Sequence, residues 1–486
     1  MTCLRFTNPI ETAEFLDIHG HEIPVLSEGE VDGVCNVLRE RADTYFSHHE
    51  NDLARLVELN HKWLDPGFEY REQALEIVPA TSGFSRETIE TFGFYPFTWD
   101  FSFSLPSGPM PELEPFEDGY MKSIGTHPAS PRRPEFITRV LFGNVVGYDA
   151  ITLLHGITSK VPQLVKVASG QPLFSFIYAN SVEAMDPELR GTFFLAYWRG
   201  GDRQVEDAVF SRADLIDVWG SNETISDVQH RVAAMDNGPR VVENPHRIGM
   251  SFISRDYRDD PRVAGLLALD IACWSGMACF STKNVFVEGE LADVTAFGKR
   301  VAKSLQEQVK RFGTVQSPGL GPEMLHFAEG YETLELAGKD VVLLRPARGA
   351  RWLVVIDGRP LAALQPTTSL APMCAISAVP DLESATGFLA EQEDAWLFFE
   401  EASIAVPKDQ LLPFSNKLID MGFMNIKTLG SMAFPKQWEP HGGSFFNIPI
   451  TNENDTFGAT NTLKWVCVDT RDIDVELESN ARRFHV

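Results

Sequence analysis

Residues 136–243 repeat one pattern, in which a short run of apolar and β-branched residues is followed by a helical stretch and then by the next run. Strands separated by helices of this length are typical of βαβ units, whose strands pair in parallel. The pattern therefore predicts a parallel sheet covered by helices, an architecture suited to a nucleotide-binding domain. The expected strands cover residues 136–142, 164–168, 192–198, 215–219 and 240–243.

The residues on either side of this repeat also show patterns that predict helices, strands and a connector. Ser27 and Glu30 have the spacing of a capping box, so we expect a helix from there toward His49 and a second helix over residues 52–63. Residues 106–134 are rich in proline and glycine, which predicts an extended connector. After residue 279 we expect a second α/β pattern, with a helix over 291–312 and strands at 341–344 and 352–356.

These patterns predict an α/β protein with four regions. Residues 1–130 are expected to form an N-terminal helical region and connector, and 131–246 a nucleotide-binding domain. Residues 247–435 are expected to form a catalytic domain, and 436–486 a segment that returns to the body or to an oligomer interface. A chain of 486 residues, 44% of them hydrophobic, is long enough to bury two or three cores.

Composition excludes several classes of protein. The net charge of -26 and the pI near 4.9 argue against a general nucleic-acid binder, which needs clustered cations. The six cysteines show no paired spacing, which argues against a disulfide framework or a zinc site and favours a reducing cytoplasm. No leader pattern or membrane-spanning run is visible. The 34 phenylalanines either fill cores or line a channel for an apolar acyl chain.

Cys279 is the strongest candidate for chemistry. It follows Ser275, Gly276 and Ala278 and precedes Ser281, so small side chains leave room for a carbonyl to approach the sulfur. Backbone N–H groups of such a segment can stabilise the resulting oxyanion. The alternative is an inert buried thiol, which is how most free cysteines behave. Cys273, on the same segment, is expected to be structural.

Two turns and one strand end lie at the edge where parallel α/β sheets bind ligands. Asn144, in a Gly-Asn-Val-Val-Gly turn, is a candidate oxyanion donor or a simple turn residue. Lys166, near a strand end, can meet a nucleotide's ribose or phosphate, or can be solvated. Gly220 and Ser221 begin a turn that can open a helix toward a phosphate. Neither this turn nor the glycine turn at residues 198–203 is a GxGxxG dinucleotide fingerprint, so the sequence signal for dinucleotide binding is weak on its own.

Together these residues resemble the aldehyde dehydrogenase superfamily, and more closely its LuxC-type acyl-CoA reductases. The resemblance spans nearly the whole chain. It includes residues 63–66 with Arg71, 143–145, 166–172, 186–187, 198–202, the Cys279 segment, Gly422, 429–432, 440–443 and 463–465. The implied fold is aldehyde-dehydrogenase-like, with a largely parallel sheet in both the nucleotide-binding and the catalytic domain.

The resemblance also implies roles. Cys279 would attack a thioester carbonyl while Asn144 and the Cys279 backbone N–H hold the oxyanion. A nicotinamide cofactor, NADPH or else NADH, would reduce the acyl-enzyme to an aldehyde. Lys166, Ser169, Gly220 and Ser221 would contact that cofactor. No metal is implied.

Two positions depart from the aldehyde dehydrogenase pattern. His246 stands where the hydrolytic enzymes carry the glutamate that activates water, which favours reduction over hydrolysis, unless His246 is a structural residue and Glu243 takes part instead. Glu223 follows the 220–221 turn with no further glycine, and an acid there is unfavourable beside a pyrophosphate unless it points away or meets a ribose hydroxyl.

The sequence therefore predicts NAD(P)H-dependent reduction of an acyl thioester to an aldehyde. The acyl donor is expected to be acyl-CoA or an acyl-carrying or acyl-transferring protein, and the chain to be a homo-oligomer without nucleic-acid partners. Two rivals remain at this level: a cysteine acyltransferase without redox chemistry, and a non-catalytic scaffold that binds acyl carriers. Arg199 and Arg203 either meet a 2′-phosphate or are surface charges.

Overall fold

The structure is a computed structural model that divides the chain into two compact units. It describes residues 12–48, 53–99, 121–124, 127–129, 134–315, 320–346, 351–358, 372–392, 398–435, 439, 467–469 and 471–486. The first unit contains residues 1–82, 89–245 and 444–464, and the second contains 83–88, 246–443 and 465–486. Most of the expected connector and the motifs at 440–443 and 463–465 lie outside the described residues. The four expected regional boundaries stay predictions.

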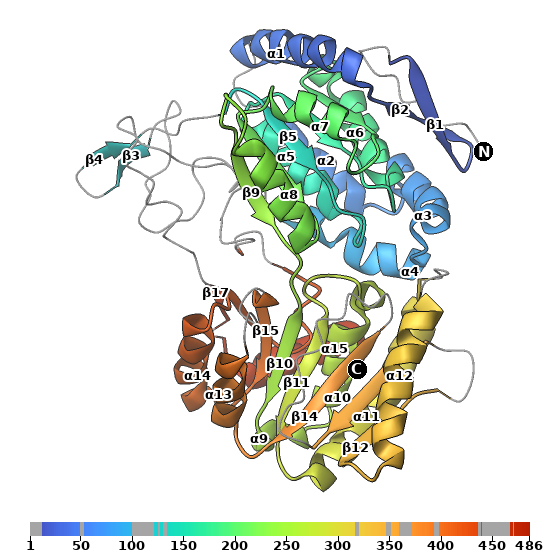
Figure 1. Cartoon of the computed structure of the whole chain (residues 1–486), viewed down its shortest axis with the longest axis vertical. Helices are drawn as coiled ribbons and strands as arrows, with labels where there is room; N and C mark the ends of the chain where they lie inside the picture. The colour runs from blue at the N-terminus through green and yellow to red at the C-terminus, as the bar shows by residue number, and fades with distance from the viewer. Residues whose placement is uncertain are drawn as a thin grey trace. The chain divides into compact units, whose positions relative to one another are not determined.

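The first unit is built on a five-stranded parallel sheet, as the repeat predicts (Figure 1). Its strand order is β7-β6-β5-β8-β9, so the chain starts in the middle and reverses direction between β5 and β8. At such a reversal, the loops that follow the two neighbouring strands run to opposite faces of the sheet. They leave a crevice at the carboxyl ends of the strands. The strands are β5 (Ile137–Val140), β6 (Gln163–Lys166), β7 (Phe193–Ala196), β8 (Leu215–Trp219) and β9 (Arg240–Asn244).

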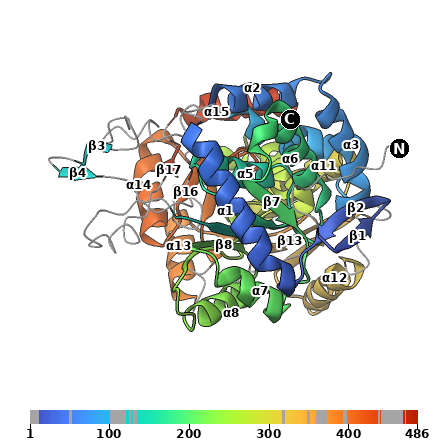
Figure 2. The ribbon, with the colours of Figure 1, turned by 90° about the horizontal axis from the view of Figure 1, so that it is seen from above.

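Helices cover both faces of this sheet. The chain crosses one face through α5 and α6 and the other through α7 and α8, and α1 lies across the second face (Figure 2). Ser27 and Glu30 form the expected capping box before α1. The helices of this unit are α1 (Val31–His48), α2 (Leu53–Leu64), α3 (Glu69–Ser82), α5 (Tyr148–Thr158), α6 (Leu173–Met185), α7 (Arg203–Phe210) and α8 (Asn222–Val232).

Aromatic side chains fill the space where α2 packs on α6. Trp63 is fully buried and contacts the rings of Phe97, Phe174 and Tyr178, with Phe97 stacked on it at 5.2 Å. These aromatic residues are therefore part of a core. The remaining elements of the unit are β1 (Glu14–Ile18), β2 (His21–Val25), a short π-helical turn (Ile89–Gly93), the 3-10 turns Glu28–Glu30, Tyr95–Thr98 and Pro187–Leu189, β3 (Met121–Ile124) and β4 (His127–Ala129).

The second unit is built on an eight-stranded sheet that is parallel except for its edge strand β12. Its order is β12-β13-β14-β11-β10-β15-β16-β17, and the chain reverses direction between β10 and β15 (Figure 1). The strands are β10 (Gly249–Ile253), β11 (Thr282–Glu288), β12 (Val341–Leu344), β13 (Leu353–Asp357), β14 (Met373–Val379), β15 (Glu401–Ala405), β16 (Asn425–Thr428) and β17 (Cys467–Val468).

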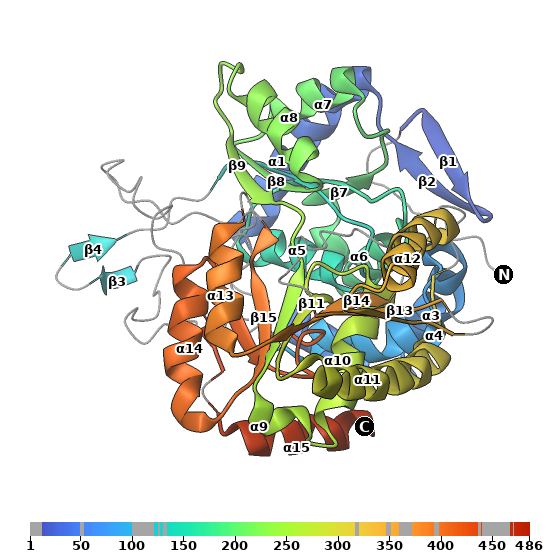
Figure 3. The same cartoon turned by 60° about the horizontal axis from the view of Figure 1, so that its bottom comes forward.

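Helices also cover both faces of the second sheet. Val285 and Val287 of β11 face α10, α11 and α15, whereas Phe286 faces α13 and α14 (Figure 3). The helices are α4 (Arg86–Thr88), α9 (Arg255–Arg258), α10 (Val263–Ala272), α11 (Leu291–Phe312), α12 (Leu320–Leu336), α13 (Leu382–Glu391), α14 (Lys408–Asp420) and α15 (Ile473–Phe484). In the described part of the chain, none of the helices is long and apolar enough to cross a membrane.

Candidate functional site

The turn that carries Asn144 follows β5 and is fixed from several sides. Gly147 has φ +95° and begins α5, and a Cβ placed there would lie 1.9 Å from the carbonyl oxygen of Gly93. The Gly147 N–H donates to the carboxylate of Asp149, which also accepts a hydrogen bond from the Ser175 hydroxyl. Burial raises the pKa of Asp149 to about 6. Asn144 is half-buried on a rigid turn beside the point where the sheet reverses.

Lys166 is the last residue of β6, the strand next to β5. Its side chain is buried, with the ammonium 5.9 Å from the ring centre of Trp198, and burial lowers its pKa while Glu206 opposes the shift. Ser169 follows three residues later and is exposed. A lysine held at the carboxyl edge of a parallel sheet, with an exposed hydroxyl beside it, suits a ribose or phosphate group.

Gly220 and Ser221 follow β8, on the other side of the reversal. Ser221 caps α8 by accepting a hydrogen bond from the Thr224 N–H. A Cβ on Gly220 would meet the Thr224 side chain at 2.9 Å, so the backbone packs closely against the first turn of the helix. Glu223 is exposed on that turn. The structure therefore gathers Asn144, Lys166, Ser169, Gly220 and Ser221 on the carboxyl edge of one sheet.

Cys279 lies in the second unit, three residues before β11, after an unusual backbone turn. Trp274 (φ 52°), Ser275 (φ 56°) and Gly276 (φ 73°) are all left-handed. Side chains on L-residues disfavour this conformation, which persists only where surrounding contacts enforce it. Here the Ser275 hydroxyl accepts a hydrogen bond from the Val315 N–H, and Trp274 is fully buried. This turn fixes the direction in which the chain enters the Cys279 segment.

The Cys279 thiol has a distinctive electrostatic environment. Burial raises its pKa well above the ordinary value, and the Glu400 and Glu401 carboxylates raise it further. Hydrogen bonds from the backbone N–H groups of Phe280 and Cys279 oppose this shift. The same N–H groups can stabilise negative charge that develops beside the sulfur. The resting side chain is therefore a thiol, and it needs a proton acceptor to become a nucleophile.

The amino ends of β11, β10 and β15 meet at one edge of the sheet and bring further groups to the Cys279 side. His246 and Arg247 lie three and two residues before β10, and Glu400 directly precedes β15. Arg247 Nε donates to Glu400 Oε2 over 3.3 Å, and Glu400 is buried. The His246 ring makes an edge contact with Phe398 at 6.2 Å. Cys279 and His246, both predicted from the sequence, thus lie on the same edge.

A buried carboxylate ties the helix before Cys279 to a distant loop. Asp270 of α10 accepts hydrogen bonds from the N–H groups of Gly430 (2.8 Å) and Met432 (3.1 Å). Burial raises the pKa of Asp270 to about 7, and hydrogen bonds from these groups and from Ser403 oppose the shift. Residues 429–432, which carry one of the family-like motifs, are therefore structural supports of α10.

The segment between α10 and β11 is also fixed by hydroxyl groups. The Ser281 hydroxyl donates to the Cys273 carbonyl oxygen, and the fully buried Cys273 thiol donates to the Asp270 carbonyl oxygen, as expected of a structural cysteine. The Ser251 hydroxyl lies 2.9 Å from that of Thr282 and 2.7 Å from that of Ser403. Polar groups from three strands and one helix thus support the Cys279 segment.

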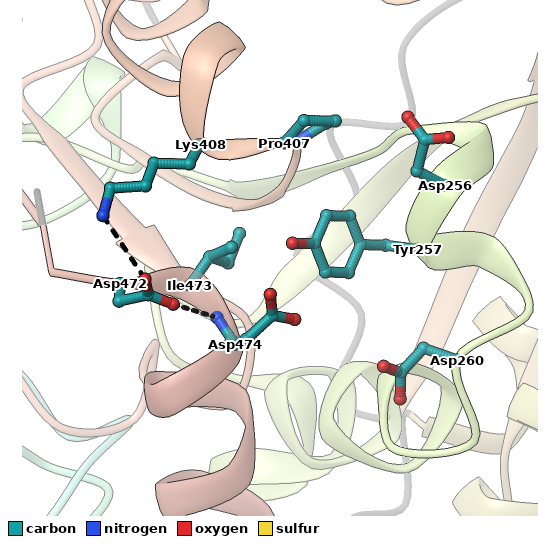
Figure 4. Close-up of a pocket in the computed structure, with 8 residues that line it drawn as sticks. All are labelled: Asp256, Tyr257, Asp260, Pro407, Lys408, Asp472, Ile473 and Asp474. Atoms are coloured by element: carbon teal, nitrogen blue, oxygen red, sulfur yellow. Dashed lines mark hydrogen bonds and ion pairs between the residues drawn. The ribbon is translucent and has the colours of Figure 1, made fainter.

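A depression of about 570 Å³ lies at the opposite edge of this sheet, after β10 and β15 (Figure 4). Two of its carboxylates have structural partners: Asp260 pairs with Arg262 at 2.6 Å, and Asp472 caps α15 and pairs with Lys408 at 3.4 Å. Because it lies at the carboxyl ends of these strands, the depression is separate from the Cys279 edge. Its lining residues are Asp256, Tyr257, Asp260, Pro407, Lys408, Asp472, Ile473 and Asp474. The described residues contain no group of His, Cys, Asp or Glu arranged to hold a metal.

The fold defined by these two units is that of the aldehyde dehydrogenases. Aldehyde dehydrogenase 21 from Physcomitrella patens, solved with the reaction product succinate, has a TM-score of 0.66 at 13% identity, covering 95% of this chain and 96% of that one. The gamma-glutamyl-gamma-aminobutyraldehyde dehydrogenase of Burkholderia cenocepacia J2315 has a TM-score of 0.68 at 15% identity, covering 89% of each chain.

Residues 125–448 match the model of the acyl-CoA reductase (LuxC) family, and the chain belongs to that family. Among curated proteins, it is 25% identical over 166 residues to long-chain acyl-protein thioester reductase 2 of Photobacterium leiognathi, which is 32% of each chain. It is 26% identical over 159 residues to the long-chain acyl-protein thioester reductase of Vibrio harveyi, which is 31% of each chain. The chain thus spans about a third of the length of these relatives.

Proposed function

We propose that this protein reduces an acyl thioester to an aldehyde with a nicotinamide cofactor, through a covalent acyl group on Cys279. The observation that carries the proposal is the Cys279 segment itself: a thiol on a strained, closely supported loop, with backbone N–H groups at the sulfur. Membership of the acyl-CoA reductase family and the names of the matched reductases support the same chemistry. The acyl donor is acyl-CoA or an acyl group carried by a protein.

The residues of the chain have separate tasks in this reaction. Cys279 attacks the thioester carbonyl, and its own backbone N–H and the Asn144 side chain hold the oxyanion. His246 replaces the water-activating glutamate of hydrolytic relatives, so the acyl group stays on the sulfur until it is reduced. The small residues around Cys279 leave space for the acyl group.

The carboxyl edge of the first sheet fits a dinucleotide. Lys166 offers a cation, Ser169 an exposed hydroxyl, and Gly220 with Ser221 a close backbone turn at the start of α8. The bound cofactor supplies hydride. We favour NADPH for two reasons. The residue three positions after Lys166 is Ser169, which brings no carboxylate that would repel a 2′-phosphate. Arg199, which follows β7, is exposed and carries a positive charge that can meet this phosphate. Arg203 is already paired with Asp227 at 2.9 Å.

The test is a turnover assay with the full chain. Acyl-CoA substrates of several lengths are mixed with NADPH or NADH, and both cofactor oxidation and aldehyde are measured. We expect aldehyde in a one-to-one ratio with oxidised cofactor, loss of turnover in Cys279→Ala, and turnover in Cys35→Ala, whose thiol is buried in the first unit. Thioester consumption without cofactor oxidation would instead indicate an acyltransferase. Binding of acyl donors without any turnover would indicate a scaffold.

The remaining expectations belong to the same proposal. The thiols of Cys35, Cys273, Cys279 and Cys374 are all free, which suits a protein of the reducing cytoplasm. We also expect a homo-oligomer, which sedimentation of the purified chain can test.

A further inference from the structure

The proposed reaction needs a group that exchanges protons with Cys279. A thioester, NADPH and one proton give an aldehyde, a thiol and NADP⁺. When the Cys279 sulfur attacks the carbonyl, the S–H bond breaks and the departing thiolate takes up a proton. When the aldehyde leaves, the carbon–sulfur bond breaks and the Cys279 sulfur takes up another. The inference below rests on this proposed function.

One cluster of charged side chains on the Cys279 side of the sheet is distinct from the residues that act in the proposed function. The Lys427 ammonium of β16 lies 2.8 Å from Glu401 Oε2 and 2.7 Å from Glu439 Oε2. We call Glu401, Lys427 and Glu439 the Lys427 cluster. All three side chains are at least nine-tenths buried. Two carboxylates around one ammonium leave an excess negative charge in a dry environment, and binding of one proton removes it.

Glu401 connects this cluster to Cys279. It is the first residue of β15, at the amino edge where Cys279 precedes β11, with only β10 between the two strands. Its carboxylate acts on the Cys279 thiol electrostatically. Burial raises the pKa of Glu401 to about 7, while Lys427 opposes the shift. A carboxyl that titrates near neutral pH can both accept and return a proton.

Three other charged groups around this edge are held by partners of their own. Glu400 is hydrogen-bonded to Arg247, and Asp270 accepts the N–H groups of the 430–432 loop. Lys283 lies on β11, and its electrostatic partners are the Cys273 and Cys374 thiols. His246 contacts Phe398. Glu401 is therefore the carboxylate of this edge that both acts on Cys279 and belongs to a cluster able to store a proton.

We infer that Glu401 is the proton-exchanging partner of Cys279 and that Lys427 positions it. Glu401 accepts the thiol proton as the sulfur attacks the thioester, and gives it to the departing thiolate. It is then protonated again from solvent, and returns that proton to the Cys279 sulfur when the aldehyde leaves. Because β10 separates β15 from β11, the transfers pass through water between the two groups. Each turnover thus consumes one proton from solvent, as the balance requires.

Two readouts on the full chain test this inference, because Glu401→Gln should move them in opposite directions. The first is the rate at which iodoacetamide alkylates Cys279, measured against pH by peptide mass spectrometry without substrate. Removing the negative charge of Glu401 favours the thiolate, so the alkylation profile should shift to lower pH and the rate at pH 7 should rise. The second is the rate of Cys279 acylation by acyl-CoA at pH 7. It should fall about 100-fold, because the proton acceptor is lost.

Two further variants serve as controls. Glu401→Asp keeps the carboxylate and should retain more acylation than Glu401→Gln. If Glu401→Gln fails to fold, Glu401→Asp still tests whether a carboxylate at this position supports acylation. Glu383→Gln removes an exposed carboxylate that pairs with Lys417 at 2.7 Å in the same unit, and should change neither readout. Wild-type acylation rates in Glu401→Gln would overturn the inference and leave the proposed function intact. Absence of Cys279 acylation in the wild-type protein would overturn the proposed function itself, and this inference with it.

Discussion

Arg139 of β5 and Asp217 of β8 form an ion pair from which water is completely excluded. The pair lies between the two strands at which the first sheet reverses its order. Gln163 accepts a hydrogen bond from Arg139 Nε at 2.9 Å, and Asn244 donates to Asp217 Oδ1 at 2.8 Å. Four strands are thus joined by one polar network in the middle of the sheet that presents Asn144 and Lys166.

Breaking this pair should destabilise the protein strongly. Asp217→Asn leaves the Arg139 guanidinium buried without its counter-charge, which costs about 3–5 kcal/mol. The double variant Arg139→Met with Asp217→Leu removes both charges and should recover most of this loss. Denaturant unfolding of the three proteins is the measurement. Equal destabilisation of the single and double variants would show that packing, and not the uncompensated charge, dominates.

Gly147→Ala should disrupt the turn that carries Asn144. An added Cβ meets the Gly93 carbonyl oxygen, and alanine disfavours the left-handed backbone, so the substitution should cost more than about 2 kcal/mol and reduce turnover. Gly200→Ala is a matched control, because a Cβ there meets nothing within 4 Å. Thermal unfolding and acylation rates should separate the two variants. If Gly147→Ala has the same thermal stability and acylation rate as the wild-type protein, the turn does not require glycine at this position.

Lys166→Met should weaken cofactor binding and leave Cys279 acylation in place. A charge-assisted hydrogen bond to a ribose or phosphate is worth about 1.5–3 kcal/mol, so the Kd for NADPH should rise about 10- to 100-fold. Fluorescence titration with NADPH measures this change. The same Kd in both proteins would remove Lys166 from the cofactor site.

Asp270 should make stability depend on pH. Its pKa rises from an ordinary value of 3.8 to about 7 in the folded protein, so the native state holds this proton more tightly than the unfolded chain. The stabilisation is fully present below about pH 4 and is lost as the pH rises to about 7, by at most on the order of 4 kcal/mol. The stability of the wild type relative to Asp270→Asn should therefore fall between pH 4 and pH 7. A constant difference across this range would contradict the shift.

Local sequence patterns were sufficient to predict much of the fold. The strand at residues 215–219, the strand at 341–344 and the helix at 291–312 were predicted with the bounds that the structure has, because their apolar periodicity is strong and their ends are marked. The strands β10, β14, β15 and β16 were missed. They are buried on both faces, so they lack the alternation that marks a half-exposed strand.

The candidate site was predicted only in part. Cys279, Asn144 and Lys166 stand out because each follows or precedes a recognisable strand. Glu401 and Lys427 could not be paired from the sequence, because 25 residues separate them and only the parallel register of β15 and β16 brings them together. The adjacent acids Glu400 and Glu401, placed directly after two phenylalanines, were the available signal for a charged group at the start of a buried strand.

The central claim is that Cys279 carries the acyl group during turnover. The most direct measurement is the mass of the intact protein after exposure to acyl-CoA or acyl-carrier protein without cofactor, with peptide mapping of the adduct. We predict one acyl group per chain on Cys279, which NADPH then removes as an aldehyde. The absence of an adduct on Cys279 with every donor and chain length, or an adduct that neither NADPH nor NADH removes, would contradict the account.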